Sequence, residues 1–220
     1  MNAQIEEMTA IANTGVDAIV WVSNRLDLHN DGDDVWIKNA EYLLSKLPED
    51  IAIGIYECPY PYKRLLTPKI LDWCISTGRF AFIKDTCCDP DMLEARLEKL
   101  KGTSIKLFNA NSQTFLYTLR HGAAGFSGIM GNFHPDLYAW VCDNYEKEPE
   151  KAERVQGFLT LTAFLEALAY PQTAKYHMNK VGVPMSLWSR SCDQKKFTKY
   201  QRMIIDELIQ TENHVREIIK

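Results

Sequence analysis

A lysine that closes an apolar run is the first residue whose type and position could do chemistry. The run spans residues 80–83, and Lys84, Asp85 and Thr86 follow it directly. Ammonium groups are almost never buried unless they are paired or used in a reaction. A neutral lysine amine attacks a carbonyl carbon to form a Schiff base, which makes Lys84 a candidate nucleophile. The alternative is a structural lysine that extends to solvent or pairs with Asp85.

A tyrosine closes the preceding apolar run, which spans residues 51–56 and ends at Tyr56. Schiff-base formation needs a group that moves protons at the carbinolamine, and a tyrosine hydroxyl within hydrogen-bond distance can do so. The amine must also be unprotonated, and burial at a dry strand end lowers the pKa of a lysine. We therefore expect Tyr56 to be the proton shuttle and Lys84 to have a lowered pKa. The alternative for Tyr56 is an aromatic side chain that only packs.

Side-chain amides follow two later runs. Asn109 and Asn111 come after residues 105–108, and Asn132 comes after the glycine-rich residues 125–131. These amides could bind a substrate carboxylate or hydroxyl groups, and each could instead be a loop cap.

Five short apolar runs alternate with helical patterns through the first two thirds of the chain. The runs span residues 17–22, 51–56, 80–83, 105–108 and 125–130, and the helical patterns span residues 1–14, 35–47, 67–77, 89–100, 112–121 and 135–145. Apolar strands with helical crossovers predict a parallel sheet covered by helices. No glycine fingerprint follows the first run, which argues against a dinucleotide-binding fold. Polar residues after each strand favour a (β/α) barrel, whose active site lies at the C-terminal ends of the strands.

Only helical patterns occur after residue 147. We therefore predict an α/β fold, an incomplete TIM (β/α) barrel of about five parallel strands in residues 1–147. Residues 148–220 are expected to be helices that pack on the barrel within a single structural domain.

The composition favours a soluble cytoplasmic protein that binds neither nucleic acid nor membranes. The 220 residues are 46% hydrophobic and carry a formal net charge of -4, so there is no basic surface for a polyanion. No apolar run reaches the roughly 18 residues of a membrane span. The six cysteines lack the spacing of a disulfide framework and are interpreted as reduced thiols.

Two possible metal sites are discounted. Residues 27–38 resemble a calcium loop, but position three is His29 and position twelve is Lys38. Their acidic residues could shape the mouth of the site instead. Cys58 and Cys87 form no Cys-x-x-Cys pair, so we interpret them as small buried thiols and expect no metal.

Four short motifs occur in the order typical of the dihydrodipicolinate synthase / N-acetylneuraminate lyase family. They are Tyr56-Glu-Cys-Pro59, Phe82-Ile-Lys84-Asp85-Thr86, Gly122-Ala-Ala-Gly125-Phe-Ser-Gly128 and Asn132-Phe-His-Pro135. The chain resembles this family over nearly its whole length. The resemblance implies a TIM-barrel class I aldolase, in which Lys84 forms a Schiff base with pyruvate or a related 2-oxo acid and Tyr56 is the catalytic tyrosine. It implies no cofactor beyond this covalent intermediate.

The resemblance also implies substrate contacts. The segment around Asn109 and Asn111 looks like the strand that lines the family's pocket, and Gly128 falls at a strand end that contains glycine or serine in the family. An arginine usually follows the Tyr-x-x-Pro proline by two residues and holds a substrate carboxylate; here Pro61 has that place and Arg64 lies just beyond. The substrate-binding candidates are Asn109, Asn111, Gly128, Asn132 and Arg64.

Family members are larger, with eight strands and about 250 residues or more. We expect the chain to begin at the helix before the family's fourth strand, without the loop that binds the pyruvyl carboxylate. Five strands cannot close such a barrel. The chain could be a fragment that needs the missing part, could pair with another copy across the open edges, or could fold as an open sheet closed by its C-terminal helices; we favour association into a homo-oligomer. The first hypothesis is a Schiff-base lyase or aldolase acting on a 2-oxo acid. The alternative is a non-catalytic remnant that serves as a binding or interaction module.

Overall fold

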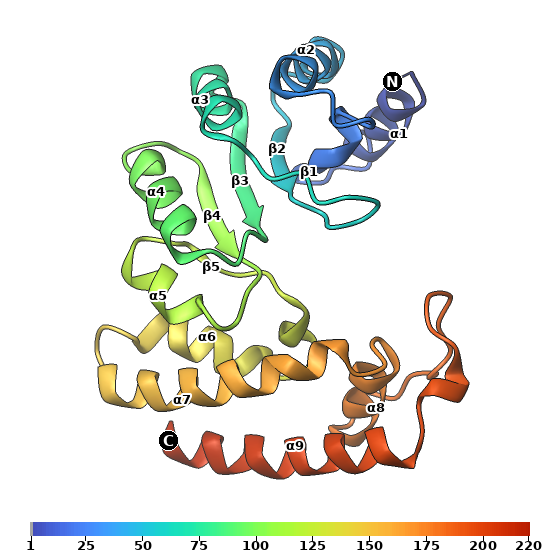
Figure 1. Ribbon diagram of the computed structural model, residues 1–220, viewed down its shortest axis with the longest axis vertical. Coiled ribbons are helices and arrows are strands. Elements are labelled where there is room, and N and C mark those ends of the chain that lie inside the picture. Colours follow the sequence, from blue (N-terminus) through green and yellow to red (C-terminus); the bar gives the residue numbers. More distant parts are fainter. Residues whose placement is uncertain (1) are drawn as a thin grey trace. The chain divides into compact units, whose positions relative to one another are not determined.

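The computed structural model describes residues 2–220, which group into two compact units (Figure 1). The first unit comprises residues 2–110 and 120–125, and the second comprises residues 111–119 and 126–220. The boundary predicted at residue 147 lies inside the second unit, and the expectation of a single domain stays a prediction. Each unit has its own hydrophobic core.

The first unit alternates helices with parallel strands. Its helices are α1 (Asn2–Ala12), α2 (Asp33–Leu44), α3 (Pro68–Thr77) and α4 (Pro90–Leu100), and its strands are β1 (Ala18–Val22), β2 (Ala52–Tyr56), β3 (Phe80–Asp85) and β4 (Lys106–Asn109). A fifth strand, β5 (Gly125–Phe126), completes the sheet order β1-β2-β3-β4-β5 and lies where the two units meet in sequence. The predicted fold class, five parallel strands with helices between them, is confirmed.

The sheet of the first unit has two chemically different faces. Ile55 pairs in register with Ile83, and Ile83 pairs with Leu107. These three side chains are buried in the core that also contains the buried residues of α2, α3 and α4. Because side chains alternate along a strand, the next register pair, Tyr56 with Lys84, lies on the opposite face.

Local sequence signals define the ends of the two helices that flank the site. Thr67 caps α3 by accepting a hydrogen bond from the Ile70 N–H at 3.3 Å, and Pro68 occupies the first turn. Asp89 caps α4 in the same way, with its carboxylate 3.0 Å from the Met92 nitrogen. These caps orient the helices that bracket the C-terminal end of β3.

The second unit is helical. It contains most of α5 (Phe115–Arg120), then α6 (Pro135–Asn144), α7 (Pro149–Thr162), α8 (Gln172–Lys180) and α9 (Lys199–Ile218), with short 3-10 helices η2 (Ile129–Asn132) and η3 (Ala163–Ala167). Thr198 and Gln201 form a capping box at the start of α9. The helical C-terminal extension is confirmed, and no helix within residues 2–220 has the length and apolarity needed to cross a membrane.

Candidate active site

Tyr56 and Lys84 lie side by side at the C-terminal ends of β2 and β3. They are a register pair, and the Lys84 Nζ lies 4.3 Å from the centre of the Tyr56 ring. On the other side of β3, Phe108 of β4 pairs in register with Lys84, so Lys84 has an aromatic residue beside it on each neighbouring strand. Both Tyr56 and Lys84 are half-buried. The structure thus brings together the two residues predicted to react.

The Tyr56 phenol retains its proton at neutral pH. Burial, and then the adjacent Cys58 side chain to which the phenol is hydrogen-bonded, raise the pKa of Tyr56 to about 12. Cys58 is held in place because its N–H donates to the Tyr56 carbonyl oxygen at 2.9 Å. A phenol in this state can donate a proton before it accepts one.

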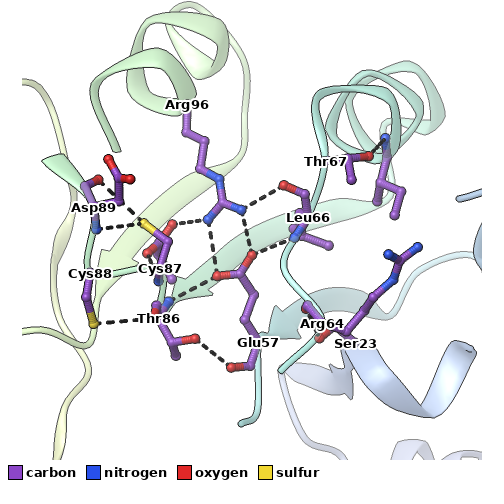
Figure 2. A network of polar contacts seen from close by, with 12 residues as sticks. Ser23, Glu57, Arg64, Leu66, Thr67, Thr86, Cys87, Cys88, Asp89 and Arg96 are labelled. Carbon is purple, nitrogen blue, oxygen red and sulfur yellow. Dashed lines mark hydrogen bonds and ion pairs between the residues drawn. The ribbon is translucent and has the colours of Figure 1, made fainter. Parts of the chain in front are cut away.

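A buried ionic network ties the ends of β2 and β3 together just beyond this pair (Figure 2). Arg96 of α4 donates through Nη2 to Glu57 Oε1 at 2.8 Å and through Nη1 to Glu57 Oε2 at 3.1 Å. The same Nη1 binds the Asp85 carboxylate, and Nη2 also donates to the Leu66 carbonyl oxygen at 2.7 Å. The Glu57 and Asp85 side chains have no exposed surface and that of Arg96 is 6% exposed.

Glu57 is also the acceptor for backbone groups on both sides of the network. Its Oε1 accepts from the Leu66 N–H at 2.7 Å, and its Oε2 accepts from the Thr86 N–H at 3.0 Å (Figure 2). Burial raises the pKa of Glu57; Arg96 opposes the rise and Asp85 adds to it. Removing one partner from such a buried ion pair typically costs about 3–5 kcal/mol, because the other charge is left without compensation.

The loop after β2 is held by an asparagine that follows β1. The Asn24 amide nitrogen donates to the carbonyl oxygens of Cys58, Tyr60 and Tyr62 at 3.0, 2.8 and 2.7 Å. Asn24 is fully buried, and the short 3-10 helix Ser23–Leu26 presents it to the loop. These hydrogen bonds from Asn24 fix the backbone conformation of the loop that follows Tyr56.

Arg64 forms ion pairs with the acidic loop that follows β1. Its guanidinium lies 2.8 Å from Asp33 Oδ1 and 3.6 Å from Asp27 Oδ2. The Asp27 carboxylate also accepts from the N–H groups of Asp31 and Gly32, at 2.8 and 3.1 Å. The acidic segment therefore folds onto itself and onto Arg64, and binding of a substrate carboxylate by Arg64 stays a prediction.

Asn109 pairs in register with Asp85, whose side chain reaches Arg96 on the helix-covered face. Alternation therefore places Asn109 on the face opposite Lys84, and Asn109 is fully buried. Binding of substrate by Asn109 stays a prediction.

The other three predicted binding residues belong to the second unit. Asn111 caps the start of the segment leading to α5, since its Oδ1 accepts from the Thr114 N–H at 3.0 Å. Gly128 directly precedes η2, and Asn132 at its end donates to the Ile129 carbonyl oxygen at 3.0 Å and to the Tyr170 hydroxyl at 3.3 Å. Binding of substrate by Asn111, Gly128 and Asn132 stays a prediction.

Sequence reasoning missed the network residues Glu57 and Arg96. Arg96 falls on the buried face of α4 together with Leu93, Leu97 and Leu100. An arginine at an apolar helical position is a signal for a buried ion pair. Its partners could not be inferred, because they lie on β3 and on the loop after β2.

Cys58 and Cys87 are half-buried thiols. Burial, followed by the charge of Asp85, raises the pKa of Cys87 to about 12, so this thiol is neither a ready nucleophile nor a ready metal ligand. Within residues 2–220, no group of three or more His, Cys, Asp or Glu side chains is arranged to hold a metal ion.

Comparison with known proteins gives matches among solved structures. No protein-family model and no curated protein matches the chain. A monomeric dihydrodipicolinate synthase variant aligns with a TM-score of 0.79 and 15% identity over 94% of this chain and 69% of its own. Dihydrodipicolinate synthase DapA-2 from Bacillus anthracis aligns with a TM-score of 0.76 and 16% identity over 95% of this chain and 70% of its own.

A third similar structure contains a bound ligand. YagE, a prophage protein of the dihydrodipicolinic acid synthase family from E. coli K12, was solved in complex with pyruvate. It aligns with a TM-score of 0.78 and 18% identity over 93% of this chain and 70% of its own. The resemblance predicted from the four motifs is confirmed at the level of the fold. Over more than nine tenths of its length, this chain has the fold of the dihydrodipicolinate synthase family.

Proposed function

We propose that this chain forms a Schiff base between Lys84 and pyruvate or a related 2-oxo acid, as a lyase or aldolase. The observation that carries the proposal is the Lys84 amine, 4.3 Å from the centre of the Tyr56 ring at the ends of two neighbouring parallel strands. An amine beside a phenol supplies both the nucleophile and the proton donor that imine formation requires.

The two residues divide the reaction between them. The neutral Lys84 amine adds to the ketone carbon, and the ketone oxygen becomes the hydroxyl of a carbinolamine. Tyr56, whose pKa is about 12, can donate its proton to that hydroxyl, which leaves as water while the C=N bond forms. The tyrosinate can then accept a proton as the bond next to the imine carbon is formed or broken. The imine nitrogen acts as the electron sink.

The substrate class rests on the fold comparison. One similar structure, YagE, is a complex with pyruvate, which is a 2-oxo acid. The aromatic flank formed by Tyr56 and Phe108 suits the methyl group and ketone of such a compound. The group that would bind its carboxylate is left open, because Arg64 is engaged with Asp27 and Asp33. A cytoplasmic location, association of copies and a reaction without a cofactor stay predictions.

Borohydride trapping tests the proposal. The protein is incubated with pyruvate and reduced, and a secondary amine at Lys84 should add the mass of pyruvic acid less one oxygen atom. Lys84→Met should abolish the adduct. The control is Lys106→Met: Lys106 of β4 pairs with Phe82, two residues before Lys84 and on the same face of the sheet, so its loss should leave the adduct intact. If no 2-oxo acid gives an adduct, the non-catalytic binding module is favoured instead.

A further inference from the structure

The register between β2 and β3 ends at the reactive pair itself. Tyr56 with Lys84 is the last pair of the ladder, and the ladder is already irregular between Ile53 and Gly54. Beyond this pair, the backbone after β2 is joined to β3 by the Glu57 N–H, which donates to the Lys84 carbonyl oxygen at 3.3 Å. Beyond the end of the ladder, how close the two strand ends stay depends on the other contacts that hold them.

The contacts that hold these ends converge on Glu57. Besides Arg96 and the two backbone N–H groups, the Thr86 hydroxyl donates to the Glu57 carbonyl oxygen at 2.7 Å (Figure 2). Glu57 directly follows Tyr56, and Asp85 directly follows Lys84. One guanidinium, that of Arg96, binds the carboxylates of both Glu57 and Asp85. Because this group is planar and rigid, it fixes the distance between the two carboxylates.

We propose that Arg96 is the positioning residue of this site, which sets the distance between the ends of β2 and β3 and thereby holds the Lys84 amine against the Tyr56 ring. Its significance for catalysis rests on the proposed function, whereas the positioning itself can be measured without any reaction. Arg96 lies on the helix-covered side of the sheet and the amine on the other, so it acts through the backbone and not on substrate.

Glu57→Gln is the variant that tests this geometry most sharply. Glu57 Oε1 faces donors from Arg96 and Leu66, and Oε2 faces donors from Arg96 and Thr86. A glutamine has nearly the same shape, but its NH2 group must face one of these pairs of donors. The contact with Arg96 is then broken on one side while the volume of the core is unchanged.

The first readout is the titration of Tyr56, followed by NMR of ring-labelled tyrosine and assigned with Tyr56→Phe. Tyr56 has a pKa of about 12 in the intact protein because it is buried beside Cys58. Once the strand ends separate, water should reach the phenol, and the pKa should move toward the ordinary value of about 10. The second readout is the rate of borohydride trapping with saturating pyruvate, which should fall about tenfold or more, since a small misplacement of reacting groups costs rate steeply.

Two further variants complete the experiment. Arg96→Lys keeps the positive charge but loses the bidentate hydrogen bonds to Glu57. It should therefore lower the pKa of Tyr56, as Glu57→Gln does, but by a smaller amount. Leu93→Ala, in the same helix, removes a fully buried apolar side chain and should lower stability without shifting that titration. If Glu57→Gln does not fold, the positioning role is tested by comparing the Tyr56 titration of Arg96→Lys with that of Leu93→Ala.

The outcomes separate the two proposals. A Tyr56 titration unchanged in the folded Glu57→Gln and Arg96→Lys variants would overturn the positioning role. An equal shift in Leu93→Ala would also overturn it, because general loosening would then be the cause. If the titration shifts as expected but wild type forms no adduct with any 2-oxo acid, positioning by Arg96 stands and the proposed chemistry fails.

Discussion

Gly54→Ala should weaken the first unit, because a methyl group at this position meets an aromatic ring. Gly54 and Phe82 are register partners on the face that carries Lys84. A Cβ at Gly54 would lie 2.2 Å from Phe82 Cζ and 2.3 Å from Cε2, far inside the ordinary carbon–carbon contact of about 3.5–4.0 Å. The Phe82 ring must therefore move by more than an ångström. This movement disturbs its edge-on contact with the Phe108 ring, whose centre lies 6.1 Å from the centre of the Phe82 ring.

The size of the effect is set by two opposing contributions. Overpacking of this kind costs about 1–3 kcal/mol, which includes an aromatic pair contribution of about 0.5–1.5 kcal/mol. Replacing glycine by alanine where the backbone permits it stabilises by about 0.4–1 kcal/mol through the unfolded state. The steric cost is the larger of the two, so we expect the free energy of unfolding to fall by about 1–2 kcal/mol.

Urea unfolding of a double-mutant cycle measures this coupling. In a Phe82→Leu background the ring is absent, and Gly54→Ala should be neutral or slightly stabilising. Tryptophan fluorescence reports on the first unit through Trp21 and Trp73, which pack edge-on against Phe80. An equal loss of stability in both backgrounds would show that the Phe82 ring is not the obstacle to a methyl group at Gly54.

Two further predictions concern the proton donor and the second unit. Tyr56→Phe keeps the ring face beside Lys84 but removes the hydroxyl, so single-turnover trapping should slow about a hundredfold or more while stability changes little; an unchanged rate would exclude Tyr56 as the proton donor. In the second unit, burial raises the pKa of Glu212, but hydrogen bonds from His134 and His177 outweigh it and hold the pKa at about 2, below the ordinary 4.5. Ionised Glu212 therefore stabilises the fold by about 3 kcal/mol above pH 4.5, and this contribution is lost as the pH falls toward 2. The free energy of unfolding, measured between pH 6 and 2.5, should show this loss in wild type and not in Glu212→Gln. If the free energies of the two proteins fell in parallel with pH, the lowered pKa of Glu212 would be contradicted.

Much of the fold could be predicted because short apolar runs and helix caps are local signals. The runs at residues 51–56 and 80–83 became β2 and β3, with Tyr56 and Lys84 near their C-terminal ends. The strand expected over residues 125–130 is only two residues long, and a 3-10 helix follows it. Gly125 adopts a φ of 155°, and a run so rich in glycine has little side-chain packing to extend a strand.

The parts of the site that could not be predicted depend on long-range partners. Asn109 ends its strand, but only the register with Asp85 shows that it lies on the face opposite Lys84. Arg64 follows the Tyr-x-x-Pro segment, yet its charge is engaged by two aspartates that precede it by more than thirty residues. Position along the chain therefore located the Tyr56–Lys84 pair but could not show which polar residues share the face of Lys84 and which support the loops.

Lys84 is proposed to form a C=N bond with a 2-oxo acid, and NMR can observe that bond without any reductant. The protein is labelled with 15N at the lysine side-chain nitrogen and mixed with pyruvate labelled with 13C at its ketone carbon. We predict a one-bond carbon–nitrogen coupling in wild type and in Lys106→Met, and its loss in Lys84→Met. Absence of the coupling in wild type at saturating pyruvate, or its persistence in Lys84→Met, would contradict the claim.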